Sequence, residues 1–365
     1  MTKPVSIPAS TAPAHILVVG LNHRSAPIEL RERLAFRREQ LPEAFARLRT
    51  EVGLREAAIL STCNRVEIYG SVPELDGTVD RLHRFLSEHG GVELHGLAPR
   101  LYTYAEPHSV QHLFAVASGI DSMVLGEGEI LHQVKHAYER AKDHGAAGKV
   151  LHALFQRALN AAKAVRSQTA IGRGHTSVGS VAVELAEKIF GDFARATVLL
   201  IGAGEIGALT LKRLSARGVR EVRIMNRSSD RAMQLAADHG VRLLPLEHLA
   251  AQLEQVDIVI SAISASGYLL RRQAVAAAMC SRHQRSLCIV DLGVPRNVDP
   301  AIGQLENVYR FDVDDLQSLV HHSTQERQAA LGESEGILNR KVAHFLEWWE
   351  EELGTAACGW KLERS

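Results

Sequence analysis

The sequence is poor in cysteine, has no excess of charge of either sign and contains no long apolar run. Its four cysteines have neither metal-ligand spacing nor the density of a disulfide framework, which fits a reducing cytosol and predicts no metal site. With 42 basic and 42 acidic residues, the chain as a whole is not a strongly basic nucleic-acid binder. No stretch approaches membrane-spanning length, and the first fourteen residues lack the apolar core of a signal peptide. We therefore expect a cytoplasmic protein.

The length and the apolar pattern predict an α/β protein with two domains and part of a third. The expected parts are a disordered arm (1–14), an N-terminal α/β domain (15–172), a Rossmann-like doubly wound domain (173–311), and a long helix with a shortened C-terminal region (312–365).

Periodicity supports this division. The first domain opens with an expected strand at 16–20, includes a helix at 106–118 and is mostly helical from Gly128 to Gln168. The second alternates helices with strands, as a parallel sheet requires; these strands are expected at 197–201, 221–225, 257–260 and 287–291. Gly172-Arg173-Gly174 is the expected hinge, and one long helical segment is expected from Asp312 to Leu353.

An apolar strand in the second domain runs directly into a G-x-G-x-x-G turn, and helical spacing continues from Ala208. Such glycines permit a tight turn and a close approach to pyrophosphate, and the helix N-terminus then faces the anion. Between a strand and a helix the pattern is far more specific than alone. The expected cofactor-binding residues here are Gly202, Ala203, Gly204, Glu205, Ile206 and Gly207.

The next strand ends in Asn226, Arg227 and Ser228, which we also expect to bind the cofactor. Proteins that bind NAD usually carry an acidic residue near this point for the ribose hydroxyl, and this chain has none. Arg227 beside Ser228 suits a 2′-phosphate, so the sequence predicts NADPH. The alternative is an arginine that is merely solvated at a strand end.

Cys63 in the first domain lies between a short apolar run, 57–60, and an alternating run that contains Val66 and Ile68. This pattern predicts a turn between two strands. A thiol in such a turn can be accessible to solvent, near turn amides and two residues before Arg65, and both features favour the nucleophilic thiolate. The alternative is a small buried hydrophobe, which most free cysteines are.

Charge is distributed unevenly along the chain. From Leu131 to Arg173, eight lysines and arginines stand against Glu139 and Asp143, whereas 311–354 is strongly acidic. The basic stretch could meet phosphates, or it could be a solvated helix surface.

Several runs make the chain resemble glutamyl-tRNA reductase, the NADPH enzyme that opens the five-carbon route to tetrapyrroles. The resemblance covers nearly the whole length. It rests on the runs 20–27, 61–69, 117–127, 202–207, 226–228, 291–296 and 314–316.

The resemblance implies a role for particular residues. Cys63 would attack the ester that joins glutamate to its tRNA and form a thioester, which NADPH reduces to glutamate-1-semialdehyde. His112 matches a family histidine important for activity, which can tune the thiol or move protons; otherwise it is a surface helix histidine. Arg65 would clamp a substrate carboxylate. The residues expected to hold the glutamyl group are Thr62, Asn64, Arg65, Ser122, Glu127, Gly128, Glu129 and Gln133.

Two departures from the family pattern stand in this group. Glu129 replaces an amide, so that a carboxylate would face the substrate's own carboxylate unless it is protonated or paired. His132 replaces a glycine and is the expected partner of Glu129.

The resemblance also implies partners: charged glutamate tRNA, with glutamate-1-semialdehyde aminomutase as a docking enzyme. Members of the family dimerise through further C-terminal helices. Because the chain stops at Ser365, apolar surface on the long helix would need another partner, and the dimer is doubtful here.

Three functions remain open at this point: an active reductase, a divergent paralog with a different acyl substrate, and a non-catalytic tRNA-binding or regulatory relative. A generic shikimate-type NADP dehydrogenase would explain Gly202 to Ser228 but not the run around Cys63.

Overall fold

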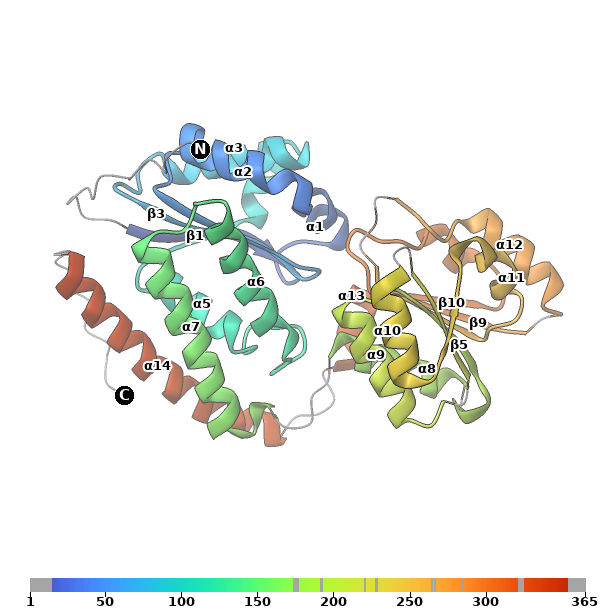
Figure 1. Ribbon diagram of the computed structural model, residues 1–365. Coiled ribbons are helices and arrows are strands. Elements are labelled where there is room, and N and C mark those ends of the chain that lie inside the picture. Colours follow the sequence, from blue (N-terminus) through green and yellow to red (C-terminus); the bar gives the residue numbers. More distant parts are fainter. Residues whose placement is uncertain are drawn as a thin grey trace.

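The computed structural model describes residues 15–172, 177–190, 193–219, 221–226, 229–263, 265, 267–283, 285–320 and 325–353. It contains two lobes that meet at α1 (Ile28–Leu34) on one side and α13 (Val313–Val320) on the other (Figure 1). The expected arm 1–14 and the expected hinge at Arg173 and Gly174 fall outside the described residues.

The first lobe is built on a four-stranded antiparallel sheet with the order β2-β3-β1-β4. β3 pairs with both β1 and β2, and the β2–β3 pairing ends at Ser61 opposite Val66. The strands predicted around 16–20 and on both sides of Cys63 are thereby confirmed. Their bounds are β1 (His15–Asn22), β2 (Glu56–Ser61), β3 (Arg65–Val72) and β4 (Tyr102–Ala105).

Helices cover both faces of this sheet (Figure 1). On one face lie α1, α2 (Leu41–Arg47), α3 (Thr78–Gly90) and the short α4 (Leu94–Leu97). On the other lie α5 (His108–Ala117), α6 (Glu129–Asp143) and α7 (Lys149–Gln168). The helix expected at 106–118 and the helical stretch beyond Gly128 are confirmed. Apolar residues from both layers form one core, as the helical and strand periodicities require.

The second lobe is a six-stranded parallel sheet with the order β10-β9-β8-β5-β6-β7. Its central strands β5, β8 and β9 are buried on both faces, which explains their nearly continuous apolar runs. This order is that of a Rossmann fold, in which the order of successive strands reverses between β5 and β8. The strands are β5 (Thr197–Ile201), β6 (Glu221–Met225), β7 (Arg242–Leu244), β8 (Ile258–Ser261), β9 (Leu287–Asp291) and β10 (Val308–Asp312).

The four strands predicted from the sequence are confirmed, and β7 and β10 are additions at the two edges. The helices of this lobe divide between two apolar cores, one on each face of the sheet. One core contains residues of α8 (Val178–Phe190), α9 (Glu205–Ala216), α10 (Ser229–His239) and α13. The other contains residues of α11 (Leu249–Leu253) and α12 (Arg272–Ser281).

The predicted long C-terminal helix is confirmed, but its predicted start at Asp312 is wrong, because the described residues of 312–353 form two helices that pack on different lobes. Val313 and Leu316 of α13 are buried in the core of the second lobe. α14 (Gln325–Leu353) instead runs along α7 of the first lobe (Figure 1). Phe345 and Trp349 are buried there in the same core as α5 and α7. The apolar side of α14 therefore has its partner within the chain, contrary to the expectation from the sequence.

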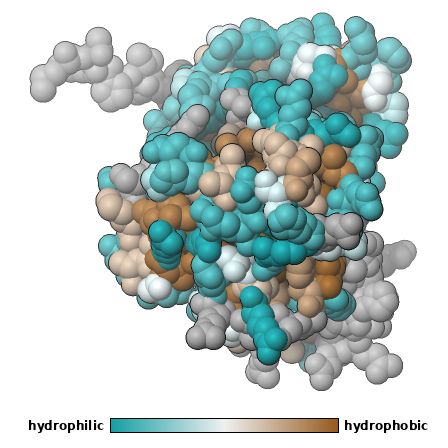
Figure 2. Space-filling view, turned by 90° about the vertical axis from the view of Figure 1, so that its right-hand side faces the viewer, coloured by the Kyte–Doolittle hydropathy of each residue, from teal (hydrophilic) through white to brown (hydrophobic). Residues whose placement is uncertain are grey.

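The end of the second lobe presents mostly hydrophilic side chains, with apolar ones in separate patches (Figure 2). Scattered apolar side chains of this kind are ordinary on a protein surface. Among the described helices, none combines the length and the apolar character needed to cross a membrane.

Candidate active site

Cys63 lies in a three-residue turn between β2 and β3, as the sequence predicts. Thr62 closes this turn, because its backbone N–H donates to the Arg65 carbonyl at 2.9 Å. Its hydroxyl also accepts from the backbone N–H groups of Asn64 and Arg65, at 3.2 and 3.1 Å. The His23 N–H donates to the Asn64 carbonyl at 2.8 Å, which ties the loop after β1 to the turn. The sulfur is therefore carried on a rigid, hydrogen-bonded turn.

The turn forms one wall of a narrow pocket with a volume of about 10 Å³. The second wall comes from the loop before α6 and from the first turn of that helix, and Val178 of α8 adds an apolar side chain from the second lobe. The lining residues are Thr62, Cys63, Asn64, Arg65, Ser122, Met123, Glu127, Glu129, Ile130, Gln133 and Val178. The pocket thus brings together every expected glutamyl-binding residue except Gly128, which caps the N-terminus of α6.

The expectation of a thiolate-favouring environment is wrong for this conformation. Burial raises the pKa of the Cys63 thiol well above its ordinary value, and the nearby carboxyls of Glu129 and Glu127 raise it further. Arg31 opposes them, and it is this arginine, not Arg65, whose guanidinium favours the thiolate. The sequence places Arg65 two residues away, but its side chain is directed into the lobe.

Arg65 is almost completely buried, and its guanidinium is already paired. It donates to Glu67 at 2.7 Å, to the Asp121 carboxylate at 3.0 Å and to the Asp121 carbonyl at 2.5 Å. Arg24 donates to the other Asp121 oxygen at 2.7 Å. In the structure as it stands, the predicted carboxylate clamp is therefore occupied by carboxylates of the protein itself.

Glu67 is the centre of this buried network. Its carboxylate accepts hydrogen bonds from Arg65, from the hydroxyls of Tyr69 (2.6 Å) and Tyr102 (2.5 Å), and from His112 Nε2 at 2.9 Å. Burial alone would raise the pKa of Glu67, but Arg65 and His112 outweigh it and hold that pKa far below its usual range. Glu67 is therefore a carboxylate with four donors around it.

His112 does not line the pocket of Cys63. It lies on α5, half-buried against Tyr102 and Tyr104, and reaches the pocket only through Glu67 and Arg65. A direct role on the thiol is not what this geometry provides. The histidine is instead placed to bias the charge of the network behind the pocket wall.

Glu127 and Glu129 are both buried in the wall opposite Cys63. Burial raises the pKa of Glu127 to about 7, and burial together with Glu127 and Glu205 raises that of Glu129 to about 8. Glu129 accepts a hydrogen bond from Gln133 at 3.1 Å. The expected pairing with His132 is wrong, because His132 contacts Glu205 of α9 at 2.6 Å. Glu129 relieves its charge by protonation instead.

The glycine-rich turn of the second lobe fits a dinucleotide. Gly202 has a φ of +114° and lies against the Ala262 carbonyl, so a side chain there would clash. Gly207 packs on the Gly202 carbonyl in the same way, which lets α9 begin close to β5. A Cβ at Gly204, by contrast, would meet nothing within 4 Å. This open side faces the N-terminus of α9, where a pyrophosphate is stabilised by the helix dipole.

Other predicted residues are placed as follows. Asn226 accepts a hydrogen bond from the Ala203 N–H at 3.2 Å, which holds the glycine turn to the end of β6. Arg227 and Ser228 lie outside the described residues. Members of the basic stretch have partners within the chain: Lys149 pairs with Glu352 at 2.5 Å, and Arg157 stacks 4.3 Å from the Trp348 ring.

Sequence reasoning missed Arg31, whose side chain is fully buried beside the turn of Cys63. A signal was available. Ile28, Arg31 and Leu34 repeat at helical spacing on the buried side of α1, and a charged residue on an apolar stripe requires a buried partner. No comparable signal marked Asp121, because its role depends on arginines from two distant segments.

Comparison with known proteins identifies both lobes. Residues 19–169 match the family model described as glutamyl-tRNA(Glu) reductase, N-terminal domain, and residues 184–319 match the model of shikimate / quinate 5-dehydrogenase.

Full-length relatives cover both lobes together. The chain is 42% identical over 334 residues to a glutamyl-tRNA reductase of Moorella thermoacetica. The aligned region spans 91% of this chain and 76% of that protein. It is 40% identical over 332 residues to one of Desulfitobacterium hafniense, with 91% and 75% covered. Among solved structures, glutamyl-tRNA reductase from Methanopyrus kandleri superposes with a TM-score of 0.51 at 33% identity, covering 92% of this chain and 81% of that one.

Proposed function

The chain belongs to the glutamyl-tRNA reductase family, and from that premise we propose that Cys63 is the residue that takes glutamate from its tRNA. The family reduces glutamyl-tRNA to glutamate-1-semialdehyde with NADPH, the first step of the five-carbon route to tetrapyrroles. The observation that carries the proposal is that the sulfur lies on a rigid turn in a pocket lined mainly by polar side chains.

The proposed reaction at Cys63 accounts for every proton and leaving group. The thiol loses its proton, the thiolate attacks the ester carbonyl, and the ribose hydroxyl of the tRNA leaves with a proton as the thioester forms. A thioester carbonyl is electrophilic enough to accept a hydride, which NADPH supplies when it is bound at the glycine turn of the second lobe. Addition of that hydride and one proton gives the aldehyde and returns the thiol.

The surrounding residues would hold the glutamyl group. Thr62 and Asn64 fix the turn, while Ser122, Glu127, Glu129 and Gln133 face the sulfur across the pocket. Gly128 would leave the entry to α6 free of a side chain, since a Cβ there would come within 3.1 Å of Arg166. Arg65 could bind the substrate carboxylate only by exchanging one of its present carboxylate partners.

His112 would act at a distance. Its proton on Nε2 is shared with Glu67, which in turn holds Arg65. Loss of this contact would therefore alter how strongly Glu67 retains Arg65 and how readily Arg65 turns to substrate.

For the cofactor, the glycine turn from Gly202 to Gly207 with Asn226 would hold the pyrophosphate side, and Arg227 with Ser228 would bind the 2′-phosphate. Replacement of Arg227 by alanine should weaken NADPH binding far more than NADH binding in a fluorescence titration. Equal losses would show that Arg227 does not distinguish the two.

A single-turnover assay tests the central proposal. Full-length protein mixed with charged glutamate tRNA, without NADPH, should form a thioester or hydrolyse the charged tRNA, and addition of NADPH should yield the aldehyde. Cys63→Ser should abolish both, whereas Cys280→Ser, at an exposed cysteine of α12, should change neither. Undiminished turnover by Cys63→Ser would overturn the mechanism.

Glu129 motivates one alternative, a divergent enzyme with a different acyl substrate, but the protonated form of this side chain counts against it. A protonated carboxyl donates a hydrogen bond and carries no charge, so it can replace the amide of the family without repelling glutamate. A non-catalytic relative is less favoured, because the cysteine and the glycine turn are both present.

We extend the proposal to partners and location. The reactive aldehyde would pass to glutamate-1-semialdehyde aminomutase, and both enzymes would work in the cytoplasm. A monomer is our expectation, because the apolar side of α14 is occupied by α5 and α7 of the same chain. Sedimentation at micromolar concentration would show a dimer if this is wrong.

A further inference from the structure

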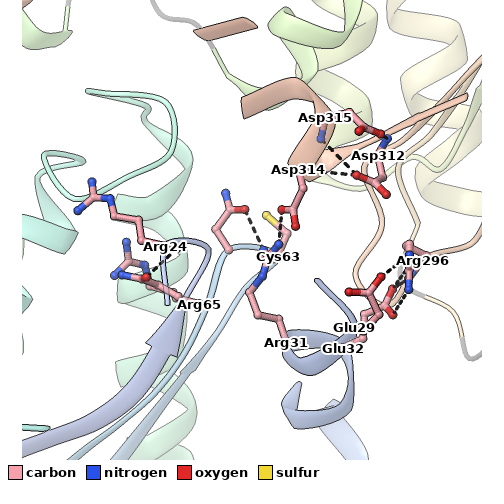
Figure 3. Close-up of polar contacts among 12 residues, drawn as sticks. Arg24, Glu29, Arg31, Glu32, Cys63, Arg65, Arg296, Asp312, Asp314 and Asp315 are labelled. Carbon is pink, nitrogen blue, oxygen red and sulfur yellow. Dashed lines mark hydrogen bonds and ion pairs between the residues drawn. The ribbon is translucent and has the colours of Figure 1, made fainter. Parts of the chain in front are cut away.

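Arg31 joins the turn of Cys63 to the other lobe. Its guanidinium donates to the Cys63 carbonyl at 2.5 Å and to Asn64 Oδ1 at 3.4 Å through one nitrogen. Its second terminal nitrogen donates to the Asp314 carboxylate. Figure 3 shows this arginine between the sulfur-bearing turn and the start of α13. One fully buried cation is thus shared between the proposed nucleophile and a carboxylate of the second lobe.

Asp314 moves with the second lobe, because α13 packs on α8 and β10. A second tie between the lobes starts from a different face of α1. Arg296, in the loop after β9, pairs with Glu29 at 3.0 Å and with Glu32 at 2.9 Å (Figure 3). Asp291 holds this loop by accepting from three backbone N–H groups, at 2.7 to 3.0 Å. Both ties connect rigid parts of the two lobes, so they form or separate together.

The charges around the sulfur explain why this sharing matters. Glu127 and Glu129, from the α6 side, disfavour the thiolate, and Arg31, from the α1 side, favours it. His23, in the loop after β1, adds no positive charge near neutral pH, because burial and the arginines around it lower its pKa to about 4. The effect of Arg31 is in turn reduced by the carboxylate of Asp314, because opposite charges in contact largely cancel at a distance.

We propose that Arg31 is a positioning residue that links the reactivity of Cys63 to contact between the lobes. While Asp314 is paired with Arg31, the cation is neutralised and the thiol stays protonated beneath Val178. When the lobes separate to admit glutamyl-tRNA, Asp314 leaves and Arg31 supports the thiolate. The nucleophile is therefore most reactive when its substrate can enter. This inference rests on the proposed role of Cys63.

The test measures the thiol directly and needs no tRNA. Full-length protein is alkylated with iodoacetamide across a pH series, and modification of Cys63 is followed by mass spectrometry of its own peptide, apart from the other three cysteines. Asp314→Asn should lower the apparent pKa of this reaction and raise its rate at pH 7 by about threefold to tenfold, since one pKa unit corresponds to a tenfold change. The matched control is Asp315→Asn, which removes the same charge one residue further on, where the carboxylate faces Arg310 rather than Arg31. It should leave the profile unchanged.

A second pair of variants isolates Arg31 itself. In an Arg31→Met background, Asp314→Asn should lose its effect, while Arg31→Lys should restore part of it. If Arg31→Met fails to fold, the comparison of Asp314→Asn with Asp315→Asn decides alone. An unshifted profile in Asp314→Asn, or an equal shift in Asp315→Asn, would overturn the inference. Neither result bears on whether Cys63→Ser retains turnover, so the two proposals fail separately.

Discussion

The candidate sites of the two lobes consist of different groups, backbone in one and charged side chains in the other. In the second lobe the expected cofactor site is backbone, a turn whose glycines let strand, helix and ligand approach one another. In the first lobe the candidate site around Cys63 consists of buried charged side chains from α1, β3, α6 and the loops between them. A site made of backbone tolerates little change in shape, and a short sequence motif is enough to identify it. A site made of paired charges tolerates little change in charge, and its partners come from distant segments.

The largest expected effect is on the charged network. Glu67→Gln keeps the shape but leaves Arg65 without its closest carboxylate, and breaking a buried pair from one side costs about 3–5 kcal/mol. Urea unfolding followed by circular dichroism should show this loss. Glu51→Gln, at an exposed carboxylate paired with Arg47, is the control and should leave the urea midpoint nearly unchanged. Similar small losses in both variants would mean that the network is not a unit.

In the backbone site, two glycines separate folding from binding. A Cβ at Gly207 would lie 2.1 Å from the Gly202 carbonyl oxygen, so Gly207→Ala should destabilise the second lobe by about 1–3 kcal/mol. Gly204→Ala should leave stability nearly unchanged, because its Cβ points into open space, yet weaken NADPH binding where the pyrophosphate approaches. Calorimetry and an NADPH titration measure the two effects. Unchanged NADPH affinity in Gly204→Ala would contradict this placement.

These two sites also show what the sequence could and could not predict. The glycine turn and the strand before it were identified correctly, because a local motif and an apolar run carry the signal. The turn of Cys63 was equally local and equally accessible. The pairing of Arg65 with Asp121 could not be predicted from the sequence, because Asp121 lies 56 residues away and only the fold brings the two together. The predicted extent of the helix Asp312–Leu353 is wrong for a similar reason. Periodicity does not show that its two parts pack in two different cores.

The stability of the first lobe should depend on pH through Glu129. Glu129 has a pKa raised to about 8, so its protonated form is favoured by folding. Its contribution to stability is complete at low pH and is lost as pH rises from its unfolded value toward 8. Glu129→Gln should therefore remove most of this pH dependence between pH 5 and 8, as seen in urea midpoints. In single-turnover assays it should also raise activity at pH 8, where the carboxylate would otherwise repel the substrate. A fall at that pH would favour a different acyl substrate.

The smallest effect is expected at a contact between the lobes that is open to solvent. His132 and Glu205 are 2.6 Å apart, but their side chains are 61% and 35% exposed. His132→Ala should change the free energy of unfolding by less than about 0.5 kcal/mol. A larger loss in low-salt denaturation would show that this pair matters more than its exposure implies.

The docking of α14 on the first lobe has a practical consequence for spectroscopy. Two of the three tryptophans, Trp348 and Trp349, lie on α14, and the third is Trp360; the entire second lobe contains none. Trp349 is sealed against the lobe, and the Trp348 ring is covered by a guanidinium. The emission of Trp348 and Trp349 will therefore report the detachment of this one helix, and melting of the second lobe alone would leave their emission unaltered.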